Sequence, residues 1–432
     1  MRARRPNASE AVPQIPRPQG AGEPRAGRSG ALRRVIFWLH LGTGVSTGLI
    51  IGLMSVTGVL LAFERQLTTW AERAVRTVPA PAANATRLDL DTLMARARAA
   101  LPDNRPSGVT LLAEPRAAVH VNFGREQVLF VNPYTGAVLG EGATRLRTFL
   151  HTMTDWHRGL GMEGERRDLG RAITGACNAA FATMVLTGLY LWWPRRWTRR
   201  ALTAIAVPSF TWRGRARDWH WHHVAGLWSA AVLLCITLTG LVMSYQWANN
   251  LLYTLTGSTP PPPRPGAGVP PEGNAARPAR GPEGAAASRR ARPAEVSPSE
   301  EAAPARVSFE TLLATAMQQA PHWRSLTLRL PQRGATQISV TLEEATSRHP
   351  LPRSLLTLDT ATAAVLQWEP YDSYNLGRTL RAWVRPVHTG EAGGVGGQVV
   401  AALASSAALI LLWTGLALTW RRLCGRRVVV SQ

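Results

Sequence analysis

Four long apolar stretches dominate the pattern of hydrophobic and polar positions along the chain. They cover residues 35–63, 172–193, 224–247 and 397–420, and none contains an acidic or arginine side chain. A helix needs roughly 20 apolar residues to cross the hydrocarbon core of a bilayer. The pattern therefore predicts four transmembrane helices. We expect the first helix to be retained, because its apolar run is about twice as long as that of a signal peptide and no small-residue cleavage site follows it.

Shorter runs between the spans predict two small domains outside the membrane. Each domain has a stretch with helical periodicity, followed by short strand-like runs that end in turn-forming residues. The expected fold class is therefore a mixed membrane protein, with four transmembrane α-helices and two small α+β domains. In chain order, the predicted helix and strands are 88–101, 108–112, 117–123 and 127–131 in the first domain and 308–319, 325–330, 337–342 and 354–358 in the second.

The charge of the chain predicts its partner and orientation. Its 49 basic and 27 acidic groups give a net charge of +22, which first suggests nucleic acid, and every basic group is an arginine. The arginines stand in blocks beside the apolar runs instead of forming one surface stripe, so we expect a lipid bilayer and no nucleic-acid partner. Blocks precede the first span, separate the second from the third and follow the fourth. The positive-inside rule therefore predicts cytoplasmic termini and a cytoplasmic middle loop.

These patterns divide the chain into segments. A stretch rich in Pro, Gly, Ala and Arg lacks the large apolar residues needed to order itself, and the same holds for the N-terminus. The predicted segments are a disordered basic N-terminus (1–34), the first span (35–63), an outer domain (64–150), a juxtamembrane segment (151–171), the second span (172–193), a cytoplasmic loop (194–223), the third span (224–247), a disordered linker (258–306), a second outer domain (307–375), a juxtamembrane segment (376–396), the fourth span (397–420) and a cytoplasmic tail (421–432).

A Thr-Gly pair recurs towards the end of every span. One such pair carries no information, because threonine and glycine are ordinary packing residues of membrane helices. Four pairs in equivalent places indicate a duplicated unit of helix, outer domain and helix. The pairs are Thr57-Gly58, Thr187-Gly188, Thr239-Gly240 and Thr414-Gly415.

Alignment on these pairs brings two histidines into register. His40 and His222 each stand 17 positions before the threonine of the pair in their own span. A glycine follows each of them four residues later, at Gly44 and Gly226. On a helix this places a side-chain-free notch one turn from the imidazole on the same face, with room for a flat ring.

Two further histidines lie ahead of the second and fourth spans, near the opposite surface. His157 precedes its threonine by 30 positions and His388 by 26, and Gly161 follows His157 by four. Imidazole is a favoured axial ligand of haem iron, and a low-spin electron-transfer haem needs one on each side. Pairing within each leaflet gives His40 with His222 inside and His157 with His388 outside. The alternative is four interfacial histidines, and zinc is disfavoured because no carboxylate or thiol stands at zinc-ligand spacing.

Other histidines compete less well for these roles. His223 and His220 adjoin His222, but the repeat register selects His222. His151 lies six residues before His157 and is a candidate to replace it or to shuttle protons. The histidines that we expect to be structural are His120, His322 and His349.

Arginines and aromatic residues gather in the sequence around the outer pair. A guanidinium group binds a carboxylate through two hydrogen bonds, so these arginines are candidates to hold haem propionates or an anionic ligand. The alternative is ordinary contact with lipid headgroups and solvent. The arginines are Arg158, Arg171, Arg378, Arg381 and Arg385, and the aromatic residues are Trp156, Tyr371, Tyr374 and Trp383.

In these motifs the chain resembles the PepSY-associated transmembrane family of bacterial inner-membrane proteins, which includes ferric-siderophore reductases of the FoxB type. The resemblance covers all four spans and extends to the outer domains, which look like PepSY domains. The motifs that carry it are Trp38-Leu39-His40 with Phe63-Glu64, Asp155-Trp156-His157-Arg158, Gly188-Leu189-Tyr190-Leu191-Trp192-Trp193-Pro194, Trp221-His222-His223-Val224, Ser244-Tyr245-Gln246-Trp247-Ala248-Asn249-Asn250 and His388-Thr389-Gly390-Glu391, each with the Thr-Gly pairs given above.

The resemblance implies a di-haem b reductase of the bacterial inner membrane with periplasmic outer domains. Such a protein passes electrons outward to ferric iron in a siderophore or similar chelate and releases ferrous iron. The family's iron ligands fall on His40, His157, His222 and His388. The chain departs from the family in the insertion 258–306 and in His223, which leaves the choice between His222 and His223 open.

The sequence leaves open more than one electron donor and more than one activity. No flavin or nicotinamide fingerprint appears, so quinol or a cytoplasmic reductase is the expected donor. The competing functions are a haem subunit that serves another periplasmic acceptor, a non-redox transporter of iron chelates, and a regulator of envelope proteases anchored by its spans. The transporter is disfavoured because the spans carry few polar residues.

Overall fold

The structure is a computed structural model. It describes residues 28–82, 84–194, 198–261, 307–330, 335–344 and 353–424. The predictions of disorder over residues 1–27 and 262–306, and of a tail over 425–432, lie outside the described residues. His349 lies outside them as well.

Four long helices form the membrane part of the molecule. They are α1 (Arg28–Leu61), α5 (Arg167–Trp192), α7 (Gly214–Ser244) and α11 (Gly394–Cys424). Each is long and apolar enough to cross a membrane, as the apolar pattern predicts. Helix α7 packs against α5 and α11, and α1 packs against the same two helices. Many large apolar side chains point outward from this bundle, which is what a lipid environment requires.

The helices extend further than their apolar runs. Helix α1 begins at Arg28, so residues 28–34 are helical and the prediction of disorder there is wrong. Helix α7 begins at Gly214, so the end of the predicted loop 194–223 also belongs to a helix, and α6 (Arg199–Ala206) lies within the same loop. The 31 residues of α7 span about 46 Å, more than the roughly 30 Å of a hydrocarbon core, so polar residues continue the helix beyond it.

Two shorter helices occupy the segments predicted as juxtamembrane. Helix α4 (Thr144–Gly159) packs against α1 and α5, and α10 (Leu376–Thr389) packs against α7. The linking elements are α2 (Glu64–Ala71), α8 (Gln246–Leu255) and the single 3₁₀ turns Gly164–Arg166, Tyr371–Ser373 and Glu391–Gly393.

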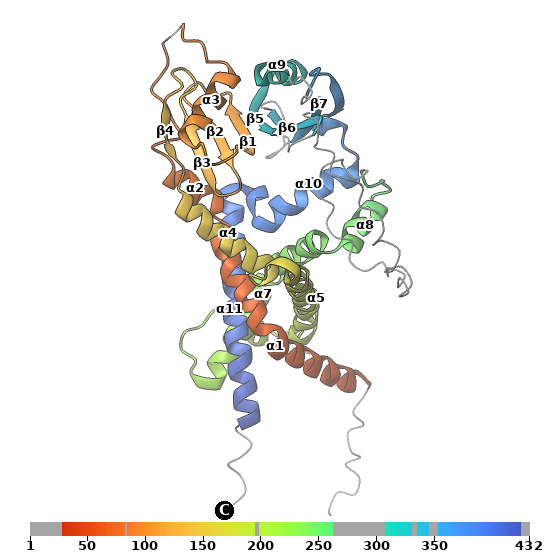
Figure 1. Ribbon diagram of the computed structural model, residues 1–432. Coiled ribbons are helices and arrows are strands. Elements are labelled where there is room, and N and C mark those ends of the chain that lie inside the picture. Colours follow the sequence, from red (N-terminus) through yellow and green to blue (C-terminus); the bar gives the residue numbers. More distant parts are fainter. Residues whose placement is uncertain are drawn as a thin grey trace, which may run out of the picture.

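The two predicted outer domains share one antiparallel sheet, which Figure 1 shows beyond one end of the helical bundle. Each contributes one helix, α3 (Leu90–Ala100) or α9 (Phe309–Gln319), and four strands. The strand order is β4-β3-β2-β1-β5-β6-β7-β8. The strands are β1 (Gly108–Leu112), β2 (Val119–Phe123), β3 (Gln127–Val131), β4 (Val138–Glu141), β5 (Trp323–Arg329), β6 (Gln337–Glu344), β7 (Ser354–Asp359) and β8 (Val365–Glu369).

The halves meet at the centre of this sheet, where β1 pairs antiparallel with β5 and Val109 lies opposite Leu328. A single apolar core extends across the junction and is covered by α3 and α9. Each of these helices caps the other. The amide of Leu90 donates to Glu310, and the amides of Phe309 and Glu310 donate to Asp91. Carboxylates at helix N-termini satisfy free amide groups there, so the two outer domains form one body.

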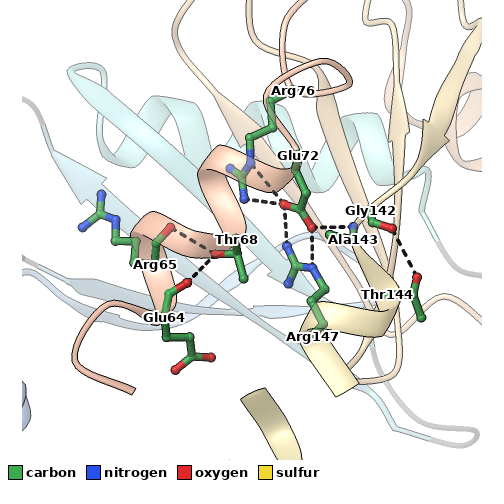
Figure 2. Close-up of polar contacts among 9 residues, drawn as sticks. All are labelled: Glu64, Arg65, Thr68, Glu72, Arg76, Gly142, Ala143, Thr144 and Arg147. Carbon is green, nitrogen blue, oxygen red and sulfur yellow. Dashed lines mark hydrogen bonds and ion pairs between the residues drawn. The ribbon is translucent and has the colours of Figure 1, made fainter. Parts of the chain in front are cut away.

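A buried carboxylate ties the sheet to the helices below it (Figure 2). Glu72, at the end of α2, is paired with Arg76 at 2.7 Å and with Arg147 of α4 at 2.6 Å. It also accepts a hydrogen bond from the amide of Ala143, before α4 begins. Burial alone would raise the pKa of Glu72, but the hydrogen bonds and charges of Arg147 and Arg76 outweigh it and hold that pKa below its ordinary value. This network fixes where α4 starts.

Candidate functional site

The four histidines selected from the sequence form two pairs at opposite ends of the bundle. We call the end beside the outer domains the sheet end. The other end, where the first turn of α1 and the last turn of α11 lie, is the basic end (Figure 1). His40 of α1 and His222 of α7 line one cavity at the basic end. His157 of α4 and His388 of α10 contact each other at the sheet end.

The basic-end pair lies in a cavity of about 720 Å³ among α1, α5, α7 and α11. Gly44 and Gly226, the glycines that follow the two histidines by one turn, both line it. Most of the wall is apolar, while four arginines gather at its rim. They are Arg33, Arg34, Arg215 and Arg422. The cavity is therefore largely apolar, and the arginines give its rim a positive charge.

The sheet-end pair is closely spaced. The ring centres of His157 and His388 lie 6.3 Å apart, with the ring planes at 71°. Burial and the neighbouring His388 lower the pKa of His157 to about 4, and burial also lowers the pKa of His388. Both imidazoles are thus neutral at pH 7, which leaves a nitrogen lone pair on each ring. Gly161 provides no notch here, because α4 ends at Gly159 and Gly161 packs against the indole of Trp156.

Every one of the four histidines is held by a Thr-Gly pair of a neighbouring helix. In each case Nδ1 of the imidazole lies within hydrogen-bond distance of the threonine Oγ1. The distances are 3.0 Å for His40–Thr187, 3.0 Å for His157–Thr57, 3.0 Å for His222–Thr414 and 3.2 Å for His388–Thr239. We call each such contact a Thr-Gly cradle.

The glycine of each cradle lets the imidazole lie against the helix backbone. A Cβ added at the glycine would contact Cε1 of the histidine ring at or near the limit of normal packing. The distances are 3.3 Å for Gly188–His40, 3.4 Å for Gly58–His157, 3.5 Å for Gly415–His222 and 3.3 Å for Gly240–His388. The sequence pattern marked these pairs only as a repeat and did not reveal their contact with the histidines.

The Thr-Gly cradles join residues of the same half of the chain, whereas the histidine pairs join residues of different halves. Each cradle lies within one half of the chain: His40 and His157 are held by α5 and α1, and His222 and His388 by α11 and α7. Each pair, in contrast, takes one histidine from each half. The sites where the pairs meet therefore lie at the interface between the halves.

The competing histidines are placed apart from the pairs or are engaged elsewhere. His223 also lines the basic-end cavity, with Nδ1 2.8 Å from the carbonyl oxygen of Trp219. His220 accepts a hydrogen bond from the amide of Ser209. His151 contacts Glu126 and Asp155 at the surface of α4.

His120 lies on β2 against the ring of Phe130. Burial, with a smaller effect from the charge of Arg76, lowers its pKa to about 4. Its Nε2 is buried without a hydrogen-bond partner among the described residues. His322 lies in the turn before β5. Neither belongs to a pair.

The arginines predicted around the outer pair fall into two groups. Arg378 is ion-paired with Glu369 and stacks on Tyr374, and Arg381 donates to Asn249, so both hold the fold together. Arg158 remains within electrostatic range of three other arginines. Burial lowers the pKa of Arg158, and so do the charges of these three arginines. They are Arg171, Arg167 and Arg385. This cationic group at the sheet end favours an anion.

Comparison with known proteins gives one family. A family model described as the PepSY-associated TM region matches residues 37–422, which includes all four histidines and all four cradles. No curated protein matches the chain.

Proposed function

The chain belongs to the PepSY-associated transmembrane family, and on that premise we propose that it is a di-haem b reductase. It carries electrons from the basic end to the sheet end and reduces ferric iron in a siderophore or similar chelate outside. The observation that supports this proposal best is the equivalent holding of four histidines in two pairs, one pair at each end of a membrane-spanning bundle.

His157 and His388 would hold the haem of the sheet end. A bond from a metal to an imidazole nitrogen is about 2 Å long, and each nitrogen lies about 1 Å from its ring centre. The 6.3 Å between the ring centres of His157 and His388 is a spacing at which both imidazoles could bind one metal ion between them.

The basic-end cavity fits a flat apolar cofactor with carboxylates. His40 and His222 line it from two helices, the glycines beside them leave its walls open, and the rim arginines supply carboxylate partners. A haem held by His40 and His222 would supply one-electron transfer at this site. The protein's own task is to supply the ligands, exclude water from them and hold the two sites at opposite ends.

The two sites are separated along the membrane normal. His40 and Thr57 lie 17 residues apart on α1, about 25 Å of helix, and Thr57 holds His157. The basic end carries the arginine blocks and faces the cytoplasm by the positive-inside rule, where quinol or a reductase delivers electrons. At the sheet end, Arg158, Arg171 and Arg385 offer positive charge to haem propionates or to an anionic chelate.

An absorption spectrum of the purified protein in detergent tests the proposal. Two b-type haems per chain by pyridine haemochrome, with sharp low-spin bands after reduction, are expected. Adding a ferric siderophore to the reduced protein should then reoxidise both haems and yield ferrous iron, trapped by a ferrous chelator. A folded protein that takes up no added haem would refute the proposal. A reduced di-haem protein that is not reoxidised by any ferric chelate would leave electron transfer to a different acceptor.

A further inference from the structure

The hydroxyl hydrogen of every cradle threonine is committed to its own helix. Each Oγ1 lies within hydrogen-bond distance of the carbonyl oxygen four residues earlier, the usual partner of a threonine within a helix. The distances are 2.8 Å for Thr57–Leu53, 2.9 Å for Thr187–Thr183, 2.7 Å for Thr239–Cys235 and 2.7 Å for Thr414–Ile410. Since a hydroxyl has one hydrogen, its oxygen can only accept from the histidine.

A second contact assigns the proton on the imidazole independently. Nδ1 of His388 lies 2.9 Å from the carbonyl oxygen of Ile236, and a carbonyl has no hydrogen to give. Nδ1 must therefore be the donor. The other three histidines make the equivalent backbone contact, in each case with the residue three before the cradle threonine. These contacts are His40 with Met184, His157 with Met54 and His222 with Leu411.

We infer that the cradle threonines are positioning residues, which hold all four histidines as the Nδ1–H tautomer with the lone pair on Nε2. The inference rests on the proposed function, since it specifies which nitrogen is offered to iron and how strongly it donates. A hydrogen bond from the far ring nitrogen of a metal-bound histidine fixes the orientation of the ring and raises the basicity of the ligating nitrogen. The cradle thus supplies both the orientation and the donor strength of each ligand.

Replacing a cradle threonine by valine or by serine separates the effect of its hydroxyl oxygen from the effect of its shape. One cradle of each histidine pair is tested. Thr187→Val and Thr57→Val keep the shape of the side chain but remove the acceptor oxygen, whereas Thr187→Ser and Thr57→Ser keep it. Thr183→Val is the matched control, because Thr183 lies one turn before Thr187 on α5 and bonds only to its own helix, at the carbonyl of Ala179. Haem affinity, the midpoint potential of each haem and the low-spin electron paramagnetic resonance spectrum are measured on the full chain in detergent.

Each valine variant should weaken haem binding at one pair by about 10- to 100-fold. It should also raise the midpoint potential of that haem, since a less basic ligand stabilises the ferric state less. The spectrum of the same haem should change, while the other haem stays as in the wild type. The serine variants and Thr183→Val should behave as the wild type.

The outcomes distinguish this inference from the proposed function. A wild-type protein without haem would refute both. Valine variants with wild-type affinity, potentials and spectra, in a protein whose haems are lost on His40→Ala or His157→Ala, would refute the positioning role alone. A valine variant that loses haem without rescue by serine would also overturn it, because packing and not the hydroxyl would then be the cause.

Discussion

Replacing a histidine at the basic end should have a different effect from replacing one at the sheet end. If the proposed function holds, His222→Ala should remove the basic-end haem and prevent reduction by a quinol from that side, because this haem would be the entry point for electrons. His157→Ala should remove the sheet-end haem and leave the other reducible by the same quinol. Haem content per chain and quinol reduction of the remaining bands measure both effects.

The matched control is His151→Ala on the same helix as His157. His151 contacts Glu126 and Asp155, so both haems should remain. Loss of a haem from this variant, or full haem content in His222→Ala, would contradict the assignment. The second result together with loss in His223→Ala would transfer the ligand role to His223.

The spacing along the chain singled out the histidines but did not reveal the residues that they contact. His40 and His222 stand out because each lies 17 positions before a Thr-Gly pair, yet the threonine that each contacts belongs to another helix. Which helices are neighbours depends on packing that no spacing within one helix contains. For the same reason the sequence did not distinguish Arg378, which pairs with Glu369, from Arg158.

Among the elements, the start of α4 depends on one buried carboxylate. Glu72→Gln should destabilise the protein by about 3 kcal/mol at pH 7, since it leaves Arg76 and Arg147 without their charge partner. Thermal unfolding in detergent measures the loss, and Glu64→Gln, at a half-buried position on the same short helix, is the control.

The difference in stability between the wild type and Glu72→Gln should also depend on pH. Glu72 has a folded pKa below its ordinary value of 4.5, so its contribution is fully present above pH 4.5 and is lost as pH falls through the folded pKa. The difference in stability between the wild type and Glu72→Gln should therefore be constant near neutral pH and shrink below about pH 4.5. A difference that grew on acidification would contradict the ion-pair account.

The helices and inner strands of the outer domains were predicted well, whereas the outermost strands of the sheet and the juxtamembrane helix α10 were missed. The predicted strands 108–112 and 127–131 coincide with β1 and β3. The outermost strands β4 and β8 were missed, since both are short, largely exposed and joined to their neighbours through irregular register. Helix α10 was missed although it is strongly amphipathic, because Pro386 within it is a residue that usually ends a helix.

For the whole molecule, the proposed orientation can be tested with cysteine labelling. Cys424 is exposed at the end of α11, and Ser339 is exposed on β6. A membrane-impermeant maleimide should label a Ser339→Cys, Cys424→Ala variant in intact spheroplasts. It should reach Cys424 of the wild type only after lysis. The reverse pattern would refute the cytoplasmic location of the basic end.

The continuous sheet also predicts that the two halves do not move apart during function. Thr110 of β1 and Thr327 of β5 lie side by side, with their hydroxyl oxygens 3.0 Å apart. A Thr110→Cys, Thr327→Cys variant should form a disulfide and keep its full rate of ferric-chelate reduction. A transporter that works by rocking its halves would be blocked by this bridge and released by reductant.

Two domains were predicted from the repeated order of helix and strands, and both exist, but their union in one sheet was not foreseen. Strands β1 and β5 are more than 200 residues apart in the chain. The alternation of apolar and polar residues along β1 or β5 does not show whether the edge of that strand stays unpaired or pairs with the other strand. The reciprocal caps between α3 and α9 depend on the same union.

The placement of the cradles has a consequence for the symmetry of the molecule. Each half holds its own two histidines, and each half contains two of the four candidate spans, so two halves inserted in the same orientation would be related by an axis along the membrane normal. A chain of half this length would already contain every residue that one protomer needs. Two copies would complete both histidine pairs across a symmetric interface. The two halves of the chain thus stand in the place of two protomers, and each half supplies one histidine to the basic-end pair and one to the sheet-end pair.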